Sequence, residues 1–101
     1  MIDRLFEVVK DRRNADPATS YVASLYRDGR AKIARKVGEE AVEAIVAALE
    51  DDRGQTVAES ADLLFHLMVL WAEMGIKPDE VMAELARREG VSGIEEKRGR
   101  V

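Results

Sequence analysis

Two pairs of acidic residues have the spacing that places side chains on one face of a helix. Glu40 and Glu43 are three residues apart, and so are Glu59 and Asp62. Residues with this separation project from the same side of a helix, so each pair presents two carboxylates to one point. If the two helices are antiparallel neighbours, four carboxylates converge on one cavity.

The surroundings of these acids favour a metal site over a solvated face. Glu43 and Asp62 lie in strongly apolar stretches, and neither has a lysine or arginine three or four residues away. Half-buried carboxylates without positive partners are costly and repel one another unless a cation lies between them. Oxygen ligands without thiolates suit Mg²⁺, with Mn²⁺ as a substitute. Spacing alone decides nothing, because random placement of the acids would give about four such pairs. Solvated faces, or pairing with distant arginines, are therefore the alternative.

A basic segment directly precedes the first acidic pair. Lys36 and Lys32 lie one and two turns before Glu40, near the same stripe as Glu43. We expect the ammonium groups of these two lysines to hold phosphate groups that are bridged to the metal. For each base the alternative is a helix-surface ion pair, such as Lys36 with Glu39. Because Glu39 has local basic partners, we rank it below the other four acids as a ligand and keep it as a possible base for water.

His66 follows Asp62 by one turn on the same helix face. A lone histidine on an apolar helix is more often a core or interface residue, satisfied by one hydrogen bond, than a functional group. A core or interface position is therefore the favoured interpretation of His66, and its role stays open.

Apolar residues recur at helical spacing along the chain, and no segment alternates with a period of two, which predicts an all-α protein. We expect a compact bundle of four to five helices. The first ends near Asn14, and a short second one starts at Asp16-Pro17 and closes at Gly29. The others span residues 30–50, 53–74 and 78–90.

The segment from Leu63 to Trp71 is apolar around nearly the whole helix circumference. A chain of 101 residues has few helices with which to cover every side of it, so we expect part of this surface to meet another subunit. The bundle would then oligomerise through apolar helices, as a homodimer or a higher oligomer. We expect residues 1–90 to form one domain and residues 91–101 to form a C-terminal tail.

Composition narrows the remaining possibilities. A net charge of −4 argues against nonspecific nucleic-acid binding, which needs a basic surface. The absence of cysteine excludes thiol nucleophiles and thiolate zinc sites. The longest apolar run is shorter than the ~20 residues of a membrane span, and the N-terminus does not read as a signal peptide. We therefore expect a soluble, cytoplasmic protein.

Three stretches resemble the phosphoribosyl-ATP pyrophosphohydrolase family of histidine biosynthesis, part of the all-α, MazG-like nucleotide pyrophosphohydrolases. They are Ser20-Tyr21, residues 36–43 (KVGEEAVE) and residues 59–67 (ESADLLFHL). The mark of the superfamily is ExxE followed, after a variable gap, by ExxD, and the gap here is residues 44–58. One departure is Val22, which stands where a small hydroxyl residue is expected.

The resemblance implies hydrolysis of phosphoribosyl-ATP to phosphoribosyl-AMP and pyrophosphate. It implies Mg²⁺ bound by the four acids. It also implies that Lys32, Lys36 or Arg30 binds phosphate and offsets the charge of the leaving group, and that Glu39, or one of the four acids, accepts a proton. Two alternatives remain at this point. One is a pyrophosphohydrolase for another nucleoside triphosphate, and the other is a helical interaction module whose acids only solubilise it.

Overall fold

The computed structural model describes residues 1–89 and Arg98, and within them the chain is helical with no strand. The elements are α1 (Ile2–Asp11), the 3₁₀ turn η1 (Arg12–Asn14), α2 (Tyr21–Asp28), α3 (Arg30–Leu49), α4 (Arg53–Met74) and α5 (Pro78–Arg87). The predicted all-α class is confirmed. Apart from Arg98, the predicted C-terminal tail lies outside the described residues.

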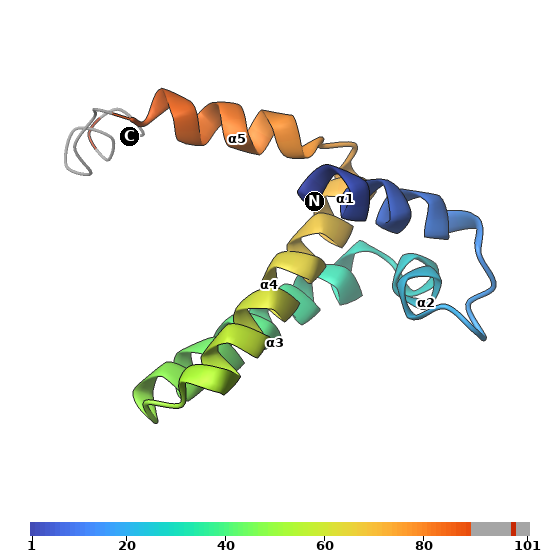
Figure 1. Ribbon diagram of the computed structural model, residues 1–101. Helices are drawn as coiled ribbons and strands as arrows, with labels where there is room; N and C mark the ends of the chain where they lie inside the picture. Colours follow the sequence, from blue (N-terminus) through green and yellow to red (C-terminus); the bar gives the residue numbers. More distant parts are fainter. Residues whose placement is uncertain (90–97, 99–101) are drawn as a thin grey trace.

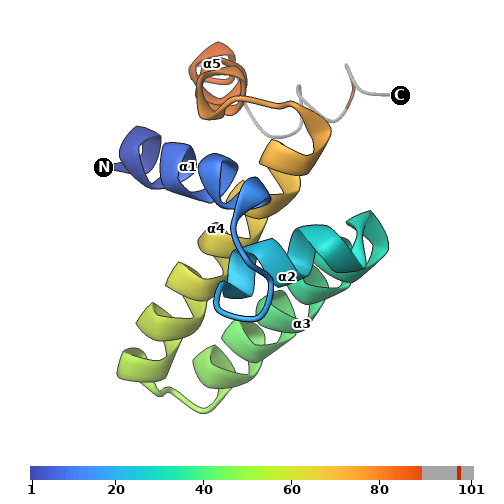
Figure 2. The same cartoon turned by 90° about the vertical axis from the view of Figure 1, so that its right-hand side faces the viewer.

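Helices α3 and α4 are antiparallel neighbours joined by a short turn, and they form the longest unit of the fold (Figure 1). Helix α1 crosses the second half of α4, and α2 lies beside the first half of α3 (Figure 2). Helix α5 leads away from this pair past α1. The radius of gyration is 15.6 Å, against about 13 Å for a globular chain of 100 residues. Among the described helices, this arrangement therefore leaves long faces without a partner helix.

The ends of α4 follow the signals in the sequence. The side chain of Asp52 accepts a hydrogen bond from the Gln55 backbone N–H at 3.0 Å, which caps the helix start. Gly75 ends the helix with φ +72°, a left-handed conformation that glycine adopts without a side-chain clash. These two caps fix the helix that carries the second acidic pair.

The predicted start of α2 at Asp16-Pro17 is wrong. The helix begins at Tyr21, because the Ser20 hydroxyl accepts from the Ala23 N–H at 3.1 Å and acts as the cap. Asp16 instead closes a turn, in which its carboxylate accepts from the Ala18 N–H at 2.9 Å.

The predicted end of α5 at Gly90 is also too late. The helix ends at Arg87, and the backbone N–H groups of Arg88 and Glu89 donate to carbonyls three residues earlier. This tightening of the last turn closes the helix before Gly90.

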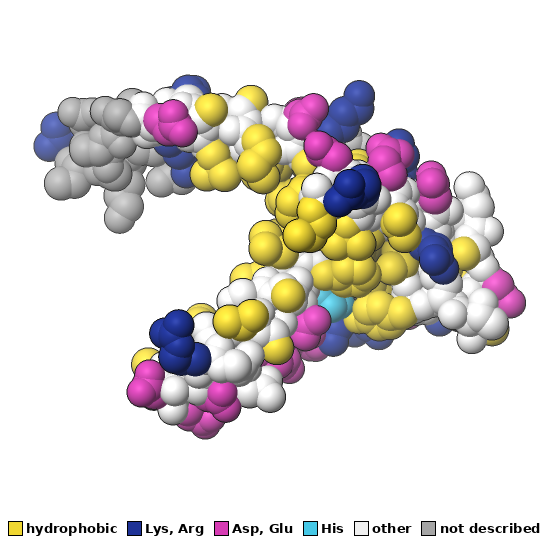
Figure 3. Space-filling model, in the orientation of Figure 1, with side chains coloured by type: hydrophobic (Ala, Val, Ile, Leu, Met, Phe, Trp, Pro, Cys, Tyr) yellow, Lys and Arg dark blue, Asp and Glu magenta, His cyan; other side chains and the backbone are white. Residues whose placement is uncertain are grey.

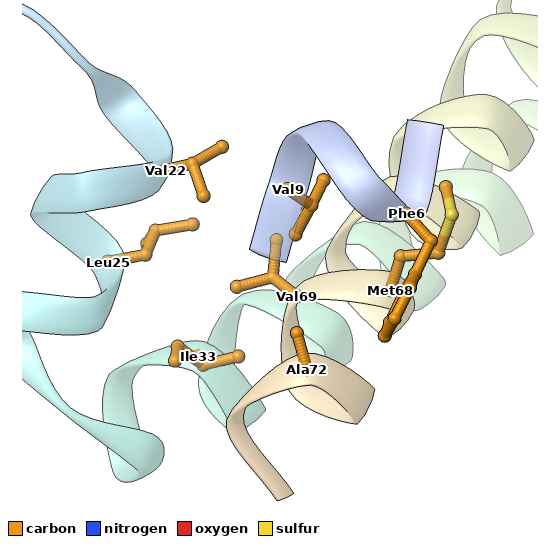
Figure 4. Close-up of a cluster of buried hydrophobic side chains, with 8 residues drawn as sticks. All are labelled: Phe6, Val9, Val22, Leu25, Ile33, Met68, Val69 and Ala72. Carbon is orange, nitrogen blue, oxygen red and sulfur yellow. The ribbon is translucent and has the colours of Figure 1, made fainter. Parts of the chain in front are cut away.

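The core lies where α1, α2, α3 and α4 meet (Figure 4). Its buried side chains are Phe6, Val9, Val22, Leu25, Ile33, Met68, Val69 and Ala72. Val22 points into this cluster and is only 9% exposed. An apolar side chain therefore suits the position at which the resemblance suggested a hydroxyl residue.

The apolar segment Leu63 to Trp71 is partly buried inside the subunit, and Leu64 within it is 47% exposed. Met68 and Val69 are fully buried, and Phe65 and Trp71 pack at the edge of the core. An exposed apolar stripe lies on α3, at positions that repeat with helical spacing: Val42, Ile45, Val46 and Leu49. We call these four residues the α3 stripe.

Further apolar surface lines the hollow between α5 and the α3–α4 pair (Figure 3). Exposed large side chains at the end of α4 and on α5 include Met74, Met82 and Leu85. None of the described helices combines the length and the apolar composition that crossing a bilayer would require.

Candidate metal centre

The turn between α3 and α4 brings the two acidic pairs to the same level. Glu43 lies seven residues before Glu50 and Glu59 lies seven residues after Asp52, at the two sides of the turn. Because the helices run antiparallel with the same rise per residue, residues equally far from the turn face each other. One carboxylate oxygen from each of Glu40, Glu43 and Glu59 lies within 4.8 Å of the others. We call these three residues the carboxylate cluster.

Two oxygens of the carboxylate cluster are buried without a partner. Glu40 is only 7% exposed, and its Oε2 accepts no hydrogen bond within the described part of the chain. The same holds for Oε2 of Glu59. A buried carboxylate oxygen left unpaired costs free energy, and a cation bound between the carboxylates removes that cost. An all-oxygen donor set of this kind fits a hard divalent cation.

The proximity of the carboxylates changes the acidity of Glu59. A hydrogen bond shared with Glu43 raises the pKa of Glu59 from 4.5 to about 7, and burial and Glu40 contribute in the same direction. Without a cation, the cluster therefore keeps a proton near neutral pH. A divalent cation would take over the role of that proton.

This shift predicts how the stability of the metal-free protein depends on pH. The folded-state pKa of Glu59 is above the unfolded value, so protonation stabilises the fold fully below about pH 4.5, and this stabilisation is lost as the pH rises through about 7. We expect the melting temperature in EDTA to fall between pH 5 and 8, and to fall less with excess Mg²⁺. Thermal melts of the wild-type protein and of Glu59→Gln measure this. Identical pH profiles for the two proteins would contradict it.

Asp62 lies one turn beyond Glu59 on α4 but outside the carboxylate cluster. Its side chain is exposed, and its backbone oxygen accepts from Nδ1 of His66 at 2.8 Å. Asp62 lies ten residues after Asp52 on α4, and Glu40 lies ten residues before Glu50 on α3. The two residues are therefore equally far from the turn. The structure thus brings three of the four predicted ligands together and leaves the fourth beside them.

Lys36 lies beside Glu40, a member of the carboxylate cluster. Its Nζ is 3.1 Å from Glu39 Oε2 and 3.6 Å from Glu40 Oε1. The hydrogen bond to Glu39 raises the pKa of Lys36 and lowers the pKa of Glu39. Lys36 is therefore a fixed positive charge next to the cluster, while Glu39 is a weaker base than an isolated glutamate.

The other two predicted phosphate-binding residues point elsewhere. Nζ of Lys32 lies 3.9 Å from Asp28, and Nε of Arg30 lies 4.0 Å from Glu73. Arg30 precedes Glu40 by ten residues, a separation of about 15 Å along the helix. The structure does not bring Arg30 to the carboxylate cluster.

Tyr21 and His66 lie beside the site. The sequence assigned neither of them a role in it. The Tyr21 hydroxyl lies 2.9 Å from Nε2 of His66, which is 5% exposed. Burial raises the pKa of Tyr21. The positive charge of Lys36 lowers this pKa, and the negative charge of Glu40 raises it. His66 is buried and makes two hydrogen bonds. In the sequence, Tyr21 was marked only by belonging to one of the three stretches that resemble the family.

Comparisons with known proteins cover almost the whole chain. A family model described as phosphoribosyl-ATP pyrophosphohydrolase matches residues 2–89. A protein of Rhodospirillum rubrum named phosphoribosyl-ATP pyrophosphatase is 60% identical over 99% of this chain and 86% of its own length. Proteins with the same name from Azospirillum brasilense and Paramagnetospirillum magneticum are 55% and 53% identical over 99% of this chain, and over 90% and 92% of their own lengths.

Proposed function

Because the chain belongs to the phosphoribosyl-ATP pyrophosphohydrolase family, we propose that it hydrolyses phosphoribosyl-ATP to phosphoribosyl-AMP and pyrophosphate. This is the second step of histidine biosynthesis, and we propose that the protein carries it out in the cytoplasm. The observation that carries the proposal is the carboxylate cluster with its two unpaired buried oxygens. Such a cluster is what a nucleotide pyrophosphohydrolase needs and what an interaction module would have no reason to keep.

The proposed cofactor is Mg²⁺, with Mn²⁺ as a substitute. Glu40, Glu43 and Glu59 would hold it, and Asp62 would complete the set from the matching level of α4. When bound, the cation offsets phosphate charge and lowers the pKa of bound water. The unpaired oxygens of Glu40 and Glu59 support this assignment, since both need a positive partner.

Lys36 is the proposed phosphate-binding residue nearest the reaction. Its ammonium lies beside Glu40, where a phosphate group bound at the carboxylate cluster would meet it. When Lys36 turns to phosphate, Glu39 loses its hydrogen-bond partner and its pKa returns towards the ordinary value. Glu39 is then the proposed proton acceptor for the attacking water.

Lys32 and Arg30 have more distant roles in this proposal. Lys32 lies one turn before Lys36 on α3 and would contact the outer phosphates. Arg30 is about 15 Å from Glu40 along the helix. We propose that it meets the 5′-phosphate of the phosphoribosyl group, the phosphate farthest from the cleaved bond.

We also propose that the protein is a homodimer. The α3 stripe offers four apolar side chains at helical spacing, each about half or more exposed. The open shape of the subunit leaves this stripe and the apolar hollow under α5 for a second copy (Figure 3). Burying such faces is the usual reason for symmetric pairing of helical subunits.

A substrate panel tests the proposed function. With Mg²⁺ present, we expect kcat/KM for phosphoribosyl-ATP to exceed that for the ordinary ribonucleoside and deoxyribonucleoside triphosphates by at least about a hundredfold, a discrimination of roughly 3 kcal/mol. Release of pyrophosphate measures this. A preference for ordinary deoxyribonucleoside triphosphates would favour the other pyrophosphohydrolases of the superfamily. No turnover of any nucleotide would favour the interaction module.

A further inference from the structure

A second group of charges lies away from the metal centre, where α3 begins. Nη2 of Arg13 donates to Oε2 of Glu73 at 2.8 Å, and Nε of Arg30 lies 4.0 Å from Oε1 of the same carboxylate. Arg13 belongs to η1, Arg30 is the first residue of α3, and Glu73 is in the last turn of α4. Three elements therefore bring two guanidinium groups to one carboxylate.

The exposure of these side chains shows which way the group opens. The Glu73 side chain is 16% exposed, whereas those of Arg13 and Arg30 are 50% and 58% exposed. The carboxylate therefore lies beneath two guanidinium groups that reach solvent. A guanidinium carries five N–H donors, and 4.0 Å is too long for a hydrogen bond. Among the described residues, the pair thus donates one hydrogen bond to Glu73 and keeps donors for a ligand.

Arg13 is also held in place from another side. Its guanidinium lies over the ring of Tyr26, 4.8 Å from the ring centroid, where the aromatic face attracts a cation. The Tyr26 hydroxyl donates to the backbone oxygen of Val9 at 3.1 Å, which fixes the ring. A side chain that is already held in one place loses little further freedom when it binds an anion.

Positive charge exceeds negative charge in this part of the fold. Beside the two arginines, Arg27 and Lys32 share Asp28, with N–O distances of 3.0 Å and 3.9 Å. Asp28 is two residues from Arg30, so the two groups are neighbours. Four bases here pair with two acids, Asp28 and Glu73, although the whole chain carries a net charge of −4.

We propose that Arg13 and Arg30 form a binding site for a phosphate monoester and that Glu73 is the positioning residue that holds them together. The local excess of positive charge matches such a group, which carries about two negative charges at neutral pH. Arginine suits the task because its planar donors match phosphate oxygens. The inference rests on the proposed function, in which the 5′-phosphate of phosphoribosyl-ATP meets Arg30, and it adds Arg13 and Glu73 to that contact.

Arg13→Gln tests the new phosphate contact. We expect KM for phosphoribosyl-ATP to rise about tenfold or more and kcat to change less than about twofold, since the lost hydrogen bond serves substrate and transition state alike. Calorimetric binding of pyrophosphate with Mg²⁺ should change less than about twofold, because pyrophosphate lacks the distant phosphate. An unchanged KM, or an equal loss of affinity for both ligands, would overturn the proposal.

Arg12 offers a matched control in the same turn. It is exposed, and no acid pairs with it in the part of the chain that the structure describes. Arg12→Gln removes the same charge from η1 and should leave KM within about twofold of the wild-type value. A rise as large as that of Arg13→Gln would mean a general charge effect and would contradict the site. If Arg13→Gln lowers the melting temperature without raising KM, the ion pairs serve only the fold, and the proposal fails.

Two substitutions of Glu73 separate a positioning carboxylate from a competing one. In Glu73→Gln the amide oxygen can still accept from Arg13, whereas Glu73→Leu removes the acceptor. We expect KM for phosphoribosyl-ATP to rise at least about fivefold in Glu73→Leu and to stay within about twofold in Glu73→Gln. A carboxylate that only competes with phosphate for the arginines predicts a lower KM in both variants. That result would remove the positioning role.

Binding of ribose 5-phosphate separates this inference from the proposed function. In EDTA, calorimetry should show binding that weakens at least about fivefold in Arg13→Gln and in Arg30→Gln and stays unchanged in Arg12→Gln. If this pattern holds but the wild-type protein does not turn over phosphoribosyl-ATP, the proposed function fails and the phosphate site stands. If the wild-type protein binds no ribose 5-phosphate, or the Arg13 and Arg30 variants bind it as tightly as the wild type, the phosphate site fails.

Discussion

Glu59→Gln will lower kcat/KM for phosphoribosyl-ATP by about a thousandfold or more, because it removes one charged ligand from the carboxylate cluster. The Glu59 carboxylate is the only one that α4 contributes to the described cluster, so the cation would lose its link between the two helices. Glutamine keeps the size of the side chain, and the packing around it should not change. The measurement is steady-state hydrolysis over a range of Mg²⁺ concentrations.

The melting temperature of the same variant shows whether the loss of activity comes from a missing metal ligand or from unfolding. In EDTA, Glu59→Gln should melt at or above the wild-type temperature at pH 8, since the substitution removes repulsion from Glu40 and Glu43. Added Mg²⁺ should then raise its melting temperature less than that of the wild-type protein. Glu89→Gln, on the exposed end of the described chain, is the matched control and should behave as wild type. Near-normal activity in Glu59→Gln would contradict the metal site.

Ile45→Asp will convert the proposed dimer into a folded monomer. Ile45 is 57% exposed in the single subunit, so an aspartate there remains hydrated and the isolated fold tolerates it. In the dimer the same charge would be buried against the apolar residues of a second copy, which costs several kcal/mol. Light scattering after size-exclusion chromatography measures the mass, and circular dichroism measures the retained helix.

A charge elsewhere on α3 serves as the control for this experiment. Ala48 is exposed but lies off the α3 stripe, so Ala48→Asp should leave the mass of the dimer unchanged. A wild-type protein that is already monomeric would refute the proposed dimer. A dimer that survives Ile45→Asp would show that the subunits meet elsewhere, for example at the hollow under α5.

The helices that carry the site could be predicted because their ends carry strong local signals. Asp52 and Gly75 bound α4 in the sequence and in the structure alike. Asp16 and Ser20 are both good caps, and only the structure shows which one starts α2. The error in α2 arose because aspartate stabilises turns and helix starts by the same kind of hydrogen bond.

The meeting of the acidic pairs also follows from the sequence. Equal numbers of residues on both sides of the turn bring Glu43 and Glu59 face to face once the two helices pair. The direction of the Asp62 side chain does not follow, because spacing fixes a helix face and not a rotamer.

Contacts between residues far apart in the sequence could not be predicted from local patterns. Arg30 faces Glu73, and Tyr21 bonds His66 across 45 residues. Neither pair has a periodic signal, because each depends on how α2 and α3 pack on the second half of α4. The same packing buries His66, Met68 and Val69 within the Leu63 to Trp71 segment and leaves the α3 stripe exposed.

The most direct measurement of the central claim is a crystal structure of the protein soaked with Mn²⁺, with the ion located by its anomalous scattering. The account predicts a peak between α3 and α4, within about 2.0–2.3 Å of carboxylate oxygens of Glu40, Glu43 and Glu59. Asp62 should turn towards the same ion. A carboxylate cluster without a peak, at a Mn²⁺ concentration that supports catalysis, would contradict the account.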